Sequence, residues 1–224
     1  MTQLPDDAGP GRRRRRDKLE PNPQVRREIL AAASISLREN GVRGLNIAAV
    51  LERTNLSTRA FYRHFNSMDD LVAAVFQEAA RVERRRLQRR MAGAATPIEA
   101  VAAWIDGRLD LAFDARIGSD LRRLSLEAQF QTSASPALVE PAYAEMLKPL
   151  ADALQQGLQD KVFHPIDPAT EARFVHGVVW AGINQQWTTG ECDRDDLRRH
   201  ILGFCLRGLG VAPHAINRIC ADAP

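Results

Sequence analysis

Apolar residues recur along this chain at the three- and four-residue spacing of an α-helix. The first such stripe consists of Val25, Ile29, Ala33 and Leu37. Its helix should begin at Pro23, because Asn22 is a suitable N-cap and proline is favoured at the first helical position. It should stop at Asn40-Gly41, a typical C-terminal signal. Beyond residue 92 no stretch alternates as a strand would, so the pattern predicts an all-α fold.

Two short helices joined by a tight turn are predicted next. The first follows Asn46 as its N-cap and runs to about Arg53, and the second occupies about residues 58–65 with Ser57 as its N-cap. The turn between them places Asn55 where a left-handed backbone is needed, which Asn tolerates better than most residues. A small core can close beneath them from Leu45, Ile47, Val50, Leu51, Leu56, Phe61 and Phe65.

A longer helix should run from Met68 to Met91, opened by Ser67 and Asp70 at the spacing of a capping box. Its expected apolar line is Leu71, Val75, Ala79, Val82 and Leu87. The same helix carries several arginines, most of which we interpret as a solvated face. They are Arg81, Arg84, Arg85, Arg86, Arg89 and Arg90.

Five further helices are predicted after residue 92, for a total of about nine. They are expected at about residues 97–113, 119–131, 136–158, 168–189 and 193–209. Pro149 lies inside the third of these and should kink it or end it, because proline removes a backbone hydrogen bond and crowds the preceding turn.

Charge is distributed unevenly along the chain. The net charge is +3, but residues 1–92 contain 19 basic and 11 acidic residues, and the remainder contains 12 basic and 17 acidic. A basic first part suggests a nucleic-acid module joined to something with another task, although basic helices also simply have solvated faces. Residues 1–22, which include Arg12–Arg16, are predicted to be a disordered arm that either adds phosphate contacts or is a solvated tail.

Several classes of protein are disfavoured by the sequence. No apolar run approaches the roughly 20 residues of a membrane span. The three scattered cysteines imply neither a disulfide framework nor a zinc site, and a reducing cytoplasm fits best. The chain has no HExxH, no CxxC and no Gly-rich phosphate loop, and its five histidines are dispersed. We therefore expect a cytoplasmic protein that is not an enzyme and has no cofactor or metal.

One run of residues carries a specific pattern. It is Leu56-Ser57-Thr58-Arg59-Ala60-Phe61-Tyr62-Arg63-His64-Phe65, followed by Asp69-Asp70-Leu71. Together with Ile29, Ala33, Asn40-Gly41 and Gly44-Leu45, it makes residues 23–72 resemble the helix-turn-helix domain of the TetR family of bacterial transcriptional regulators. The sequence departs from the family where Met68 replaces a usual lysine and where Thr54-Asn55 replaces a common Ala-Gly.

The resemblance implies that the helix at 58–65 enters the major groove of double-stranded DNA. Tyr62 and His64 would then bind phosphates, while Thr58 and Arg59 would face base edges. Asn46 could add a further phosphate contact. The full predicted DNA-binding set is Asn46, Ser57, Thr58, Arg59, Tyr62, Arg63 and His64.

The resemblance also implies that residues 73–224 form a ligand-binding and dimerisation domain. Expected ligand contacts are Trp104, Phe113, Glu127, Phe130, Tyr143, Met146, His176 and Trp180, with Gln129 as a further polar point. Expected homodimer contacts are Gly177, Ala181, Trp187, Leu197, Ile201 and Phe204. Each of these residues fits plain core packing as well. The effector itself is expected to be a largely apolar small molecule of unknown identity.

These observations lead to one functional hypothesis and one alternative. The hypothesis is a homodimeric repressor that binds a palindromic operator and is released by a small molecule. The alternative is a helix-turn-helix protein that has become a protein-interaction adaptor, its DNA surface weakened as at Met68. Activation rather than repression also stays open at this point.

Overall fold

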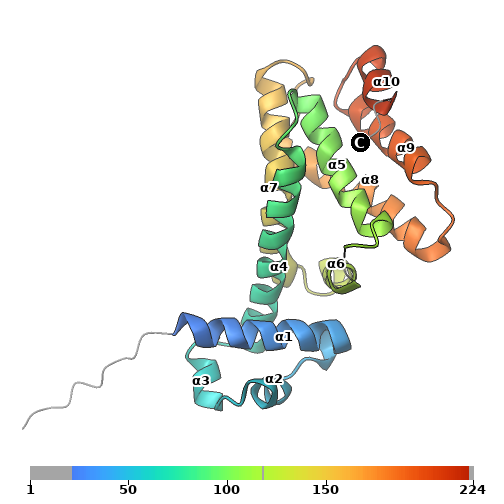
Figure 1. Cartoon of the computed structure of the whole chain (residues 1–224). Helices are drawn as coiled ribbons and strands as arrows, with labels where there is room; N and C mark the ends of the chain where they lie inside the picture. The colour runs from blue at the N-terminus through green and yellow to red at the C-terminus, as the bar shows by residue number, and fades with distance from the viewer. Residues whose placement is uncertain (1–21, 118, 222–224) are drawn as a thin grey trace, which may run out of the picture.

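The computed structural model describes residues 22–117 and 119–221, and within these ranges the chain forms ten α-helices and no β-strand (Figure 1). The helices are α1 (Pro23–Gly44), α2 (Ile47–Thr54), α3 (Thr58–Tyr62), α4 (Met68–Met91), α5 (Pro97–Phe113), α6 (Ser119–Ala134), α7 (Pro136–Gln159), α8 (Pro168–Thr189), α9 (Arg194–Gly208) and α10 (Pro213–Ala221). The all-α prediction is confirmed. The predicted arm at residues 1–22, with Arg12–Arg16, lies outside the described residues except for Asn22.

Most helices begin where the sequence predicts, because a side-chain oxygen caps the first turn. Asn22 accepts a hydrogen bond from the N–H of Gln24 at 2.9 Å, which fixes the start of α1. Ser67 accepts from the N–H of Asp70 at 3.0 Å at the start of α4. Thr96 and the residues preceding α8 and α9 act in the same way.

Two predicted helix ends differ from the structure, and of the kink or end expected at Pro149 the end does not occur. At Gly41 the backbone leaves the helical conformation (φ 67°, ψ 179°), but helical turns resume as far as Gly44. The helix α3 ends at Tyr62, short of the predicted residue 65. The helix α7 does not end at Pro149, which is buried, and it continues to Gln159. Packing along α4 and α5 offsets the hydrogen bond that the proline removes.

Two further differences concern packing rather than boundaries. Val82 was expected in the apolar line of α4, but it is 52% exposed, while Glu83 beside it is 3% exposed. The helix is therefore rotated so that a carboxylate occupies a core position. The tenth helix, α10, was not predicted, and it covers the end of the bundle with buried Ala215, Ile216 and Ile219.

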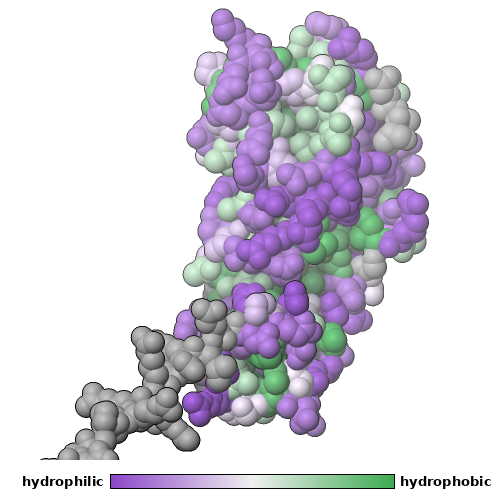
Figure 2. Space-filling view, turned by 60° about the vertical axis from the view of Figure 1, so that its left-hand side comes forward, coloured by the Kyte–Doolittle hydropathy of each residue, from purple (hydrophilic) through white to green (hydrophobic). Residues whose placement is uncertain are grey.

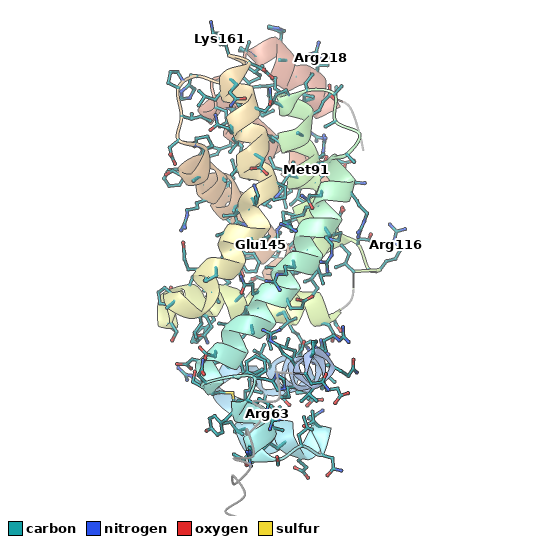
Figure 3. All side chains as sticks on the ribbon, turned by 90° about the vertical axis from the view of Figure 1, so that its left-hand side faces the viewer. Arg63, Met91, Arg116, Glu145, Lys161 and Arg218 are labelled. Carbon is teal, nitrogen blue, oxygen red and sulfur yellow. The ribbon has the colours of Figure 1, made fainter. Side chains whose placement is uncertain are left out.

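The helices are arranged in two parts joined by α4. Helices α1, α2 and α3 lie together at one end, and we call them the head (Figure 1). The helix α4 leaves the head and runs beside α7, so that Arg63 lies at one end of the molecule and Lys161 and Arg218 at the other (Figure 3). The helix α6 crosses between α1 and the bundle. The cavity described below lies in this middle region.

The surface is mainly polar on the face shown in Figure 2, with smaller apolar areas between charged side chains. Among the described residues, no helix combines the length and the apolar character that crossing a membrane requires.

Candidate DNA-binding surface and ligand cavity

The turn between α2 and α3 is held by local hydrogen bonds. Asn55 adopts the predicted left-handed backbone (φ 52°, ψ 35°), and its N–H donates to the carbonyl of Leu51. The hydroxyl of Thr54 donates to the carbonyl of Val50 at 2.9 Å. The pair Thr54-Asn55 therefore makes a sharp turn, although it replaces the more common Ala-Gly.

The buried side of α3 fixes which way its other side chains point. Phe61 is fully buried and Phe65 is 4% exposed, and their ring centroids are 5.8 Å apart. Val50 of α2 is also fully buried in the same core. Tyr62 packs edge-on against Phe61 at 5.2 Å, yet it is 53% exposed. The aromatic anchor thus turns the polar face of α3 toward solvent.

The structure brings most of the predicted DNA-binding residues onto this outward face. The exposed members are Asn46, Ser57, Thr58, Arg59, Tyr62 and Arg63, and His64 is half-buried. The amide oxygen of Asn46 accepts from Ala49, and the hydroxyl oxygen of Ser57 accepts from Ala60. These caps use only acceptor atoms, so the amide N–H₂ and the hydroxyl O–H are left as donors for a phosphate.

His64 lies at the edge of this face in a positively charged setting. Desolvation, Arg63 and Arg26 lower the pKa of His64 below its usual value. The imidazole is therefore neutral at pH 7 and can offer one N–H to an acceptor. Arg26 itself stacks over the ring of Phe65 at 5.2 Å, which keeps its charge beside α3.

Met68, which stands where the family usually has lysine, opens α4. It is partly buried and packs against the hydrophobic core. Its thioether has no hydrogen to donate, so the side chain at this position offers no donor for a phosphate. The N–H of Asn66 is already used, because it donates to the carboxylate of Asp70 at 3.1 Å.

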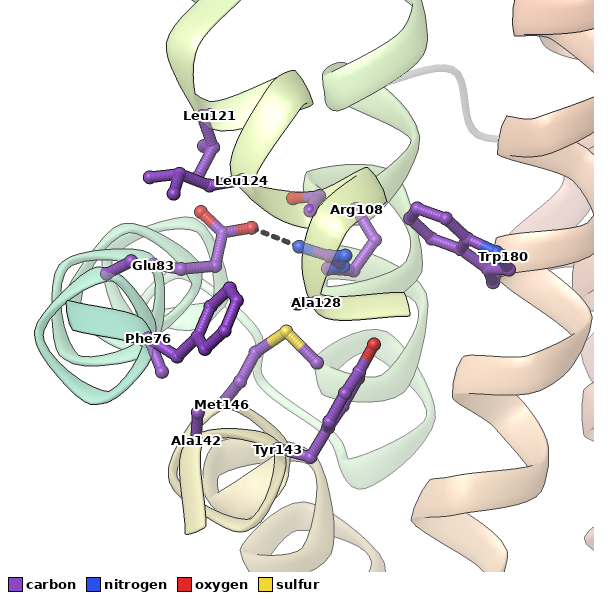
Figure 4. Close-up of a pocket in the computed structure, with 13 residues that line it drawn as sticks. Phe76, Glu83, Arg108, Leu121, Leu124, Ala128, Ala142, Tyr143, Met146 and Trp180 are labelled. Carbon is purple, nitrogen blue, oxygen red and sulfur yellow. Dashed lines mark hydrogen bonds and ion pairs between the residues drawn. The ribbon is translucent and has the colours of Figure 1, made fainter. Parts of the chain in front are cut away.

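A second candidate site is a cavity of about 60 Å³ among α4, α5, α6, α7 and α8 (Figure 4). Apolar side chains and small residues make most of its wall: Phe76, Ala79, Ala80, Leu121, Leu124, Ala128, Ala142, Met146 and Trp180. The polar lining residues are Glu83, Arg108, Ser125 and Tyr143. Such a mostly apolar hollow with few polar groups is the usual form of a small-molecule site.

Glu83 and Arg108 form a buried ion pair in the wall of this cavity (Figure 4). They are 3% and 2% exposed, and Nη1 of Arg108 donates to Oε1 of Glu83 at 2.6 Å. Arg86 also donates to both oxygens of Glu83 at 2.8 Å. Burial alone would raise the pKa of Glu83, but the hydrogen bonds and charges of the two arginines lower it. Glu83 is therefore ionised at neutral pH.

Of the residues predicted to bind a ligand, Tyr143, Met146 and Trp180 line the cavity. His176 and Trp104 lie behind that wall. The His176 ring centroid is 5.4 Å from that of Tyr143 and 6.2 Å from that of Trp104. Burial and the positive charge of Arg108 lower the pKa of His176 to about 3, so the imidazole is neutral.

The structure does not bring three other predicted ligand residues to the cavity. Glu127 accepts the N–H of Val42 at 3.2 Å and so joins α6 to α1. Phe130 is 52% exposed and lies beneath the guanidinium of Arg43. Phe113 is partly buried at the end of α5. Gln129, the further polar residue expected there, is linked to the cavity wall, because its amide oxygen accepts the hydroxyl of Tyr143 at 3.0 Å.

Glu83 and Arg108 line the cavity but were not predicted from the sequence. For Glu83 a signal was present: it lies four residues after Ala79 and four before Leu87, both on the predicted apolar line. A carboxylate at such a position indicates a buried, paired charge. Arg108 had no comparable signal, because its partner is 25 residues away in sequence.

The predicted dimerisation residues divide into two groups. Gly177, Ala181 and Phe204 are exposed, the last by 62%. Leu197 and Ile201 instead pack inside the chain against Gly182, where an added Cβ would lie 2.9 Å from Cδ1 of Ile201. Trp187 also packs within the chain, edge-on against Trp180 and beneath Arg122.

Comparisons with known proteins agree with this arrangement. Residues 29–75, which run from α1 into the first turns of α4, match the family model described as bacterial regulatory proteins, tetR family. The HTH-type transcriptional repressor KstR2 of Mycolicibacterium smegmatis is 22% identical over 191 residues, which cover 82% of this chain and 90% of that protein.

Two solved structures share the fold. RolR in complex with resorcinol has a TM-score of 0.63 and 20% identity, and the match covers 89% of this chain and 94% of that one. AibR in complex with isovaleryl coenzyme A and operator DNA has a TM-score of 0.55 and 19% identity, covering 80% of this chain and 97% of that one.

Proposed function

We propose that this chain, which belongs to the TetR family of bacterial transcriptional regulators, is a homodimeric repressor that binds a palindromic operator and is released by a small molecule. The observation that carries the proposal is the outward polar face of α3 over a buried aromatic anchor, in the segment that the family model matches. We assign residues 23–72 to DNA binding and 73–224 to ligand binding and dimerisation.

In this proposal the exposed residues of α3 divide the work of recognition. Arg59 and Thr58 face base edges in the major groove, where a bidentate arginine contributes about 1–3 kcal/mol of discrimination. Tyr62, His64 and the caps Asn46 and Ser57 donate to phosphates and set the register. Arg63 adds positive charge at the end of the helix. Because the side chain of Met68 offers no donor, binding to the phosphates depends more on these residues.

Two structural links support coupling between the cavity and the head. The helix α4 begins directly after α3, and its residues Phe76 and Glu83 line the cavity. The helix α6 lines the cavity through Leu124, while its Glu127 accepts the N–H of Val42 in α1. A ligand that favours one arrangement of these helices changes the position of α3. Operator DNA must then weaken ligand binding by the same factor.

An exposed apolar face supports the proposed homodimer. Phe174 and Phe204 are 63% and 62% exposed, and Gly177 and Ala181 lie on the exposed surface of α8. Burying such side chains against a second copy would remove apolar surface from water. A second copy packed on this face would present two α3 helices to operator half-sites ~34–36 Å apart.

The alternative function is a protein-interaction adaptor with weakened DNA binding, which the partly buried Met68 favours. Fluorescence anisotropy of the full-length protein separates the two. We expect binding to DNA from upstream of its own gene to be about 10³-fold tighter than to a shuffled duplex of equal length at physiological salt. Affinity should also fall steeply as salt rises. Equal affinity for the two duplexes would support the adaptor.

A further inference from the structure

The cavity combines an apolar body with a buried cationic side chain that has an unused donor. Arg108 is 2% exposed, and its Nη1 is engaged by Glu83. Its Nε has no hydrogen-bond partner among the described residues, and the same holds there for Nε1 of Trp104 and both ring nitrogens of His176. Of these residues, Arg108 lines the cavity, so a bound molecule can complete the hydrogen bonds of its guanidinium.

The charge in this region has a positive excess. Glu83 lies between two guanidinium groups, those of Arg86 and Arg108. The next carboxylate, Asp110, is 3.0 Å from Arg194 and 3.8 Å from Arg86. Asp110 is also 3.9 Å from Arg90, so two carboxylates are shared by four arginines, of which Arg108 lines the cavity.

The other polar groups of the cavity wall carry no charge that would offset this positive excess. Burial raises the pKa of Tyr143 to about 12, so its hydroxyl is uncharged. His176, behind the wall, is neutral as well, because its pKa is lowered to about 3. A ligand with a positive group would meet Arg108 without a free carboxylate, since all three hydrogen bonds at Glu83 are taken by arginines. A negative group is the complementary one.

We infer that the effector is a compact monocarboxylate whose carboxylate accepts from the guanidinium of Arg108 and whose apolar body lies against Phe76, Leu124 and Met146. This inference rests on the proposed function only in taking the cavity as the effector site. The cavity of about 60 Å³ has room for about five water-sized molecules. This small volume favours a compact acid over a large one.

The test is calorimetric titration of the full-length protein with benzoate, with its neutral isostere benzamide, and with hexanoate as an aliphatic acid. We expect at least one of the two acids to bind, and the preference for benzoate over benzamide to be at least tenfold. In Arg108→Gln the preference should disappear. The matched control is Arg194→Gln, whose arginine pairs with Asp110 and does not line the cavity, and it should keep the preference.

Several results would overturn the inference. These are equal affinity for benzoate and benzamide, a preference that survives in a folded Arg108→Gln, or failure of both acids to bind at millimolar concentration. If Arg108→Gln does not fold by circular dichroism, Arg108→Lys keeps a charge beside Glu83 but lacks the forked donors of a guanidinium, and it should weaken acid binding about tenfold. Unchanged acid binding in Arg108→Lys would count against the inference.

DNA binding is measured separately, without any added acid. A protein that prefers its upstream DNA but binds no acid would refute the effector class and leave the regulator proposal standing. A protein that does not discriminate between DNA sequences would refute the regulator proposal, whatever the cavity binds.

Discussion

The head and the cavity use polar residues in opposite ways. In the head, Arg59 and Tyr62 stand in solvent above the buried Phe61. In the cavity, Glu83 and Arg108 are themselves buried, 3% and 2% exposed, and each depends on the other. The contrast teaches that a polar residue in the head is free to act on a partner, whereas one in the cavity also holds the fold together.

This difference leads to separable effects of mutation. An exposed side chain can be changed with little effect on stability, usually within about 0.5 kcal/mol. Removing one partner of a buried ion pair leaves the other charge without compensation. Substitutions in the head should therefore change DNA binding at constant stability, and substitutions at the ion pair should change stability first.

The largest expected effect is that of Glu83→Ala. It leaves the buried guanidinium of Arg108 without its carboxylate, and we expect the free energy of unfolding to fall by about 3–5 kcal/mol. Urea denaturation measures this. The matched control is Glu78→Ala on the same helix, whose carboxylate is half exposed and pairs with Arg81. Equal stability of the two variants would contradict the contrast between head and cavity.

The second effect is a pH dependence of the free energy of unfolding that comes from His176. Its pKa is about 3 in the folded chain, below the ordinary value of 6.5, because burial and Arg108 disfavour the imidazolium. The unfolded chain therefore binds more protons between pH 6.5 and 3, and stability falls as pH falls through that window, by up to ~1.4 kcal/mol per unit. In His176→Phe this contribution should vanish. An unchanged pH profile in that variant would show that His176 titrates normally.

A smaller effect is expected from Arg59→Ala in the head. Discrimination at one base pair of each half-site should fall by about 1–3 kcal/mol, because a bidentate contact with guanine is lost. Tyr62→Phe removes only a hydroxyl donor and should weaken binding to all sequences about equally. Anisotropy titrations against single-base variants of the operator measure both. Altered urea midpoints in either variant would mean that these residues support the fold instead.

The smallest expected effect tests the turn beneath α3. Asn55 has a left-handed backbone (φ 52°), so Asn55→Ala should cost about 1–2 kcal/mol of stability. Asn55→Gly should cost less, because glycine has no Cβ to clash in that conformation. Thermal denaturation of the two variants provides the measurement. Equal stability of the alanine and glycine variants would contradict a left-handed backbone at Asn55.

The two regions also differ in how far the sequence alone predicts them. The caps at Asn22, Asn46 and Ser67 and the left-handed Asn55 depend on neighbouring residues, so local patterns found them. The cavity depends on contacts between distant segments, such as Glu83 with Arg108, and only its aromatic wall was predicted in part.

Two wrong predictions have the same cause, a dependence on contacts between distant segments. Glu127 was expected as a polar point of the ligand pocket, but the bend of α1 at Gly41 brings the N–H of Val42 to it instead. Val82 was assigned to the core by its apolar character, although the burial of Glu83 turns it toward solvent. Helical periodicity predicts the apolar face of a helix to within about one residue. The packing of neighbouring helices then decides which side chains are buried.

The most direct test of the central claim is selection of the full-length protein on a duplex library with a randomised central region. We predict enrichment of one palindromic sequence whose half-sites are centred ~34–36 Å apart, because two copies of α3 would read them symmetrically. Enrichment of no sequence, or of one without dyad symmetry, would contradict the claim that this chain is a homodimeric, sequence-specific regulator.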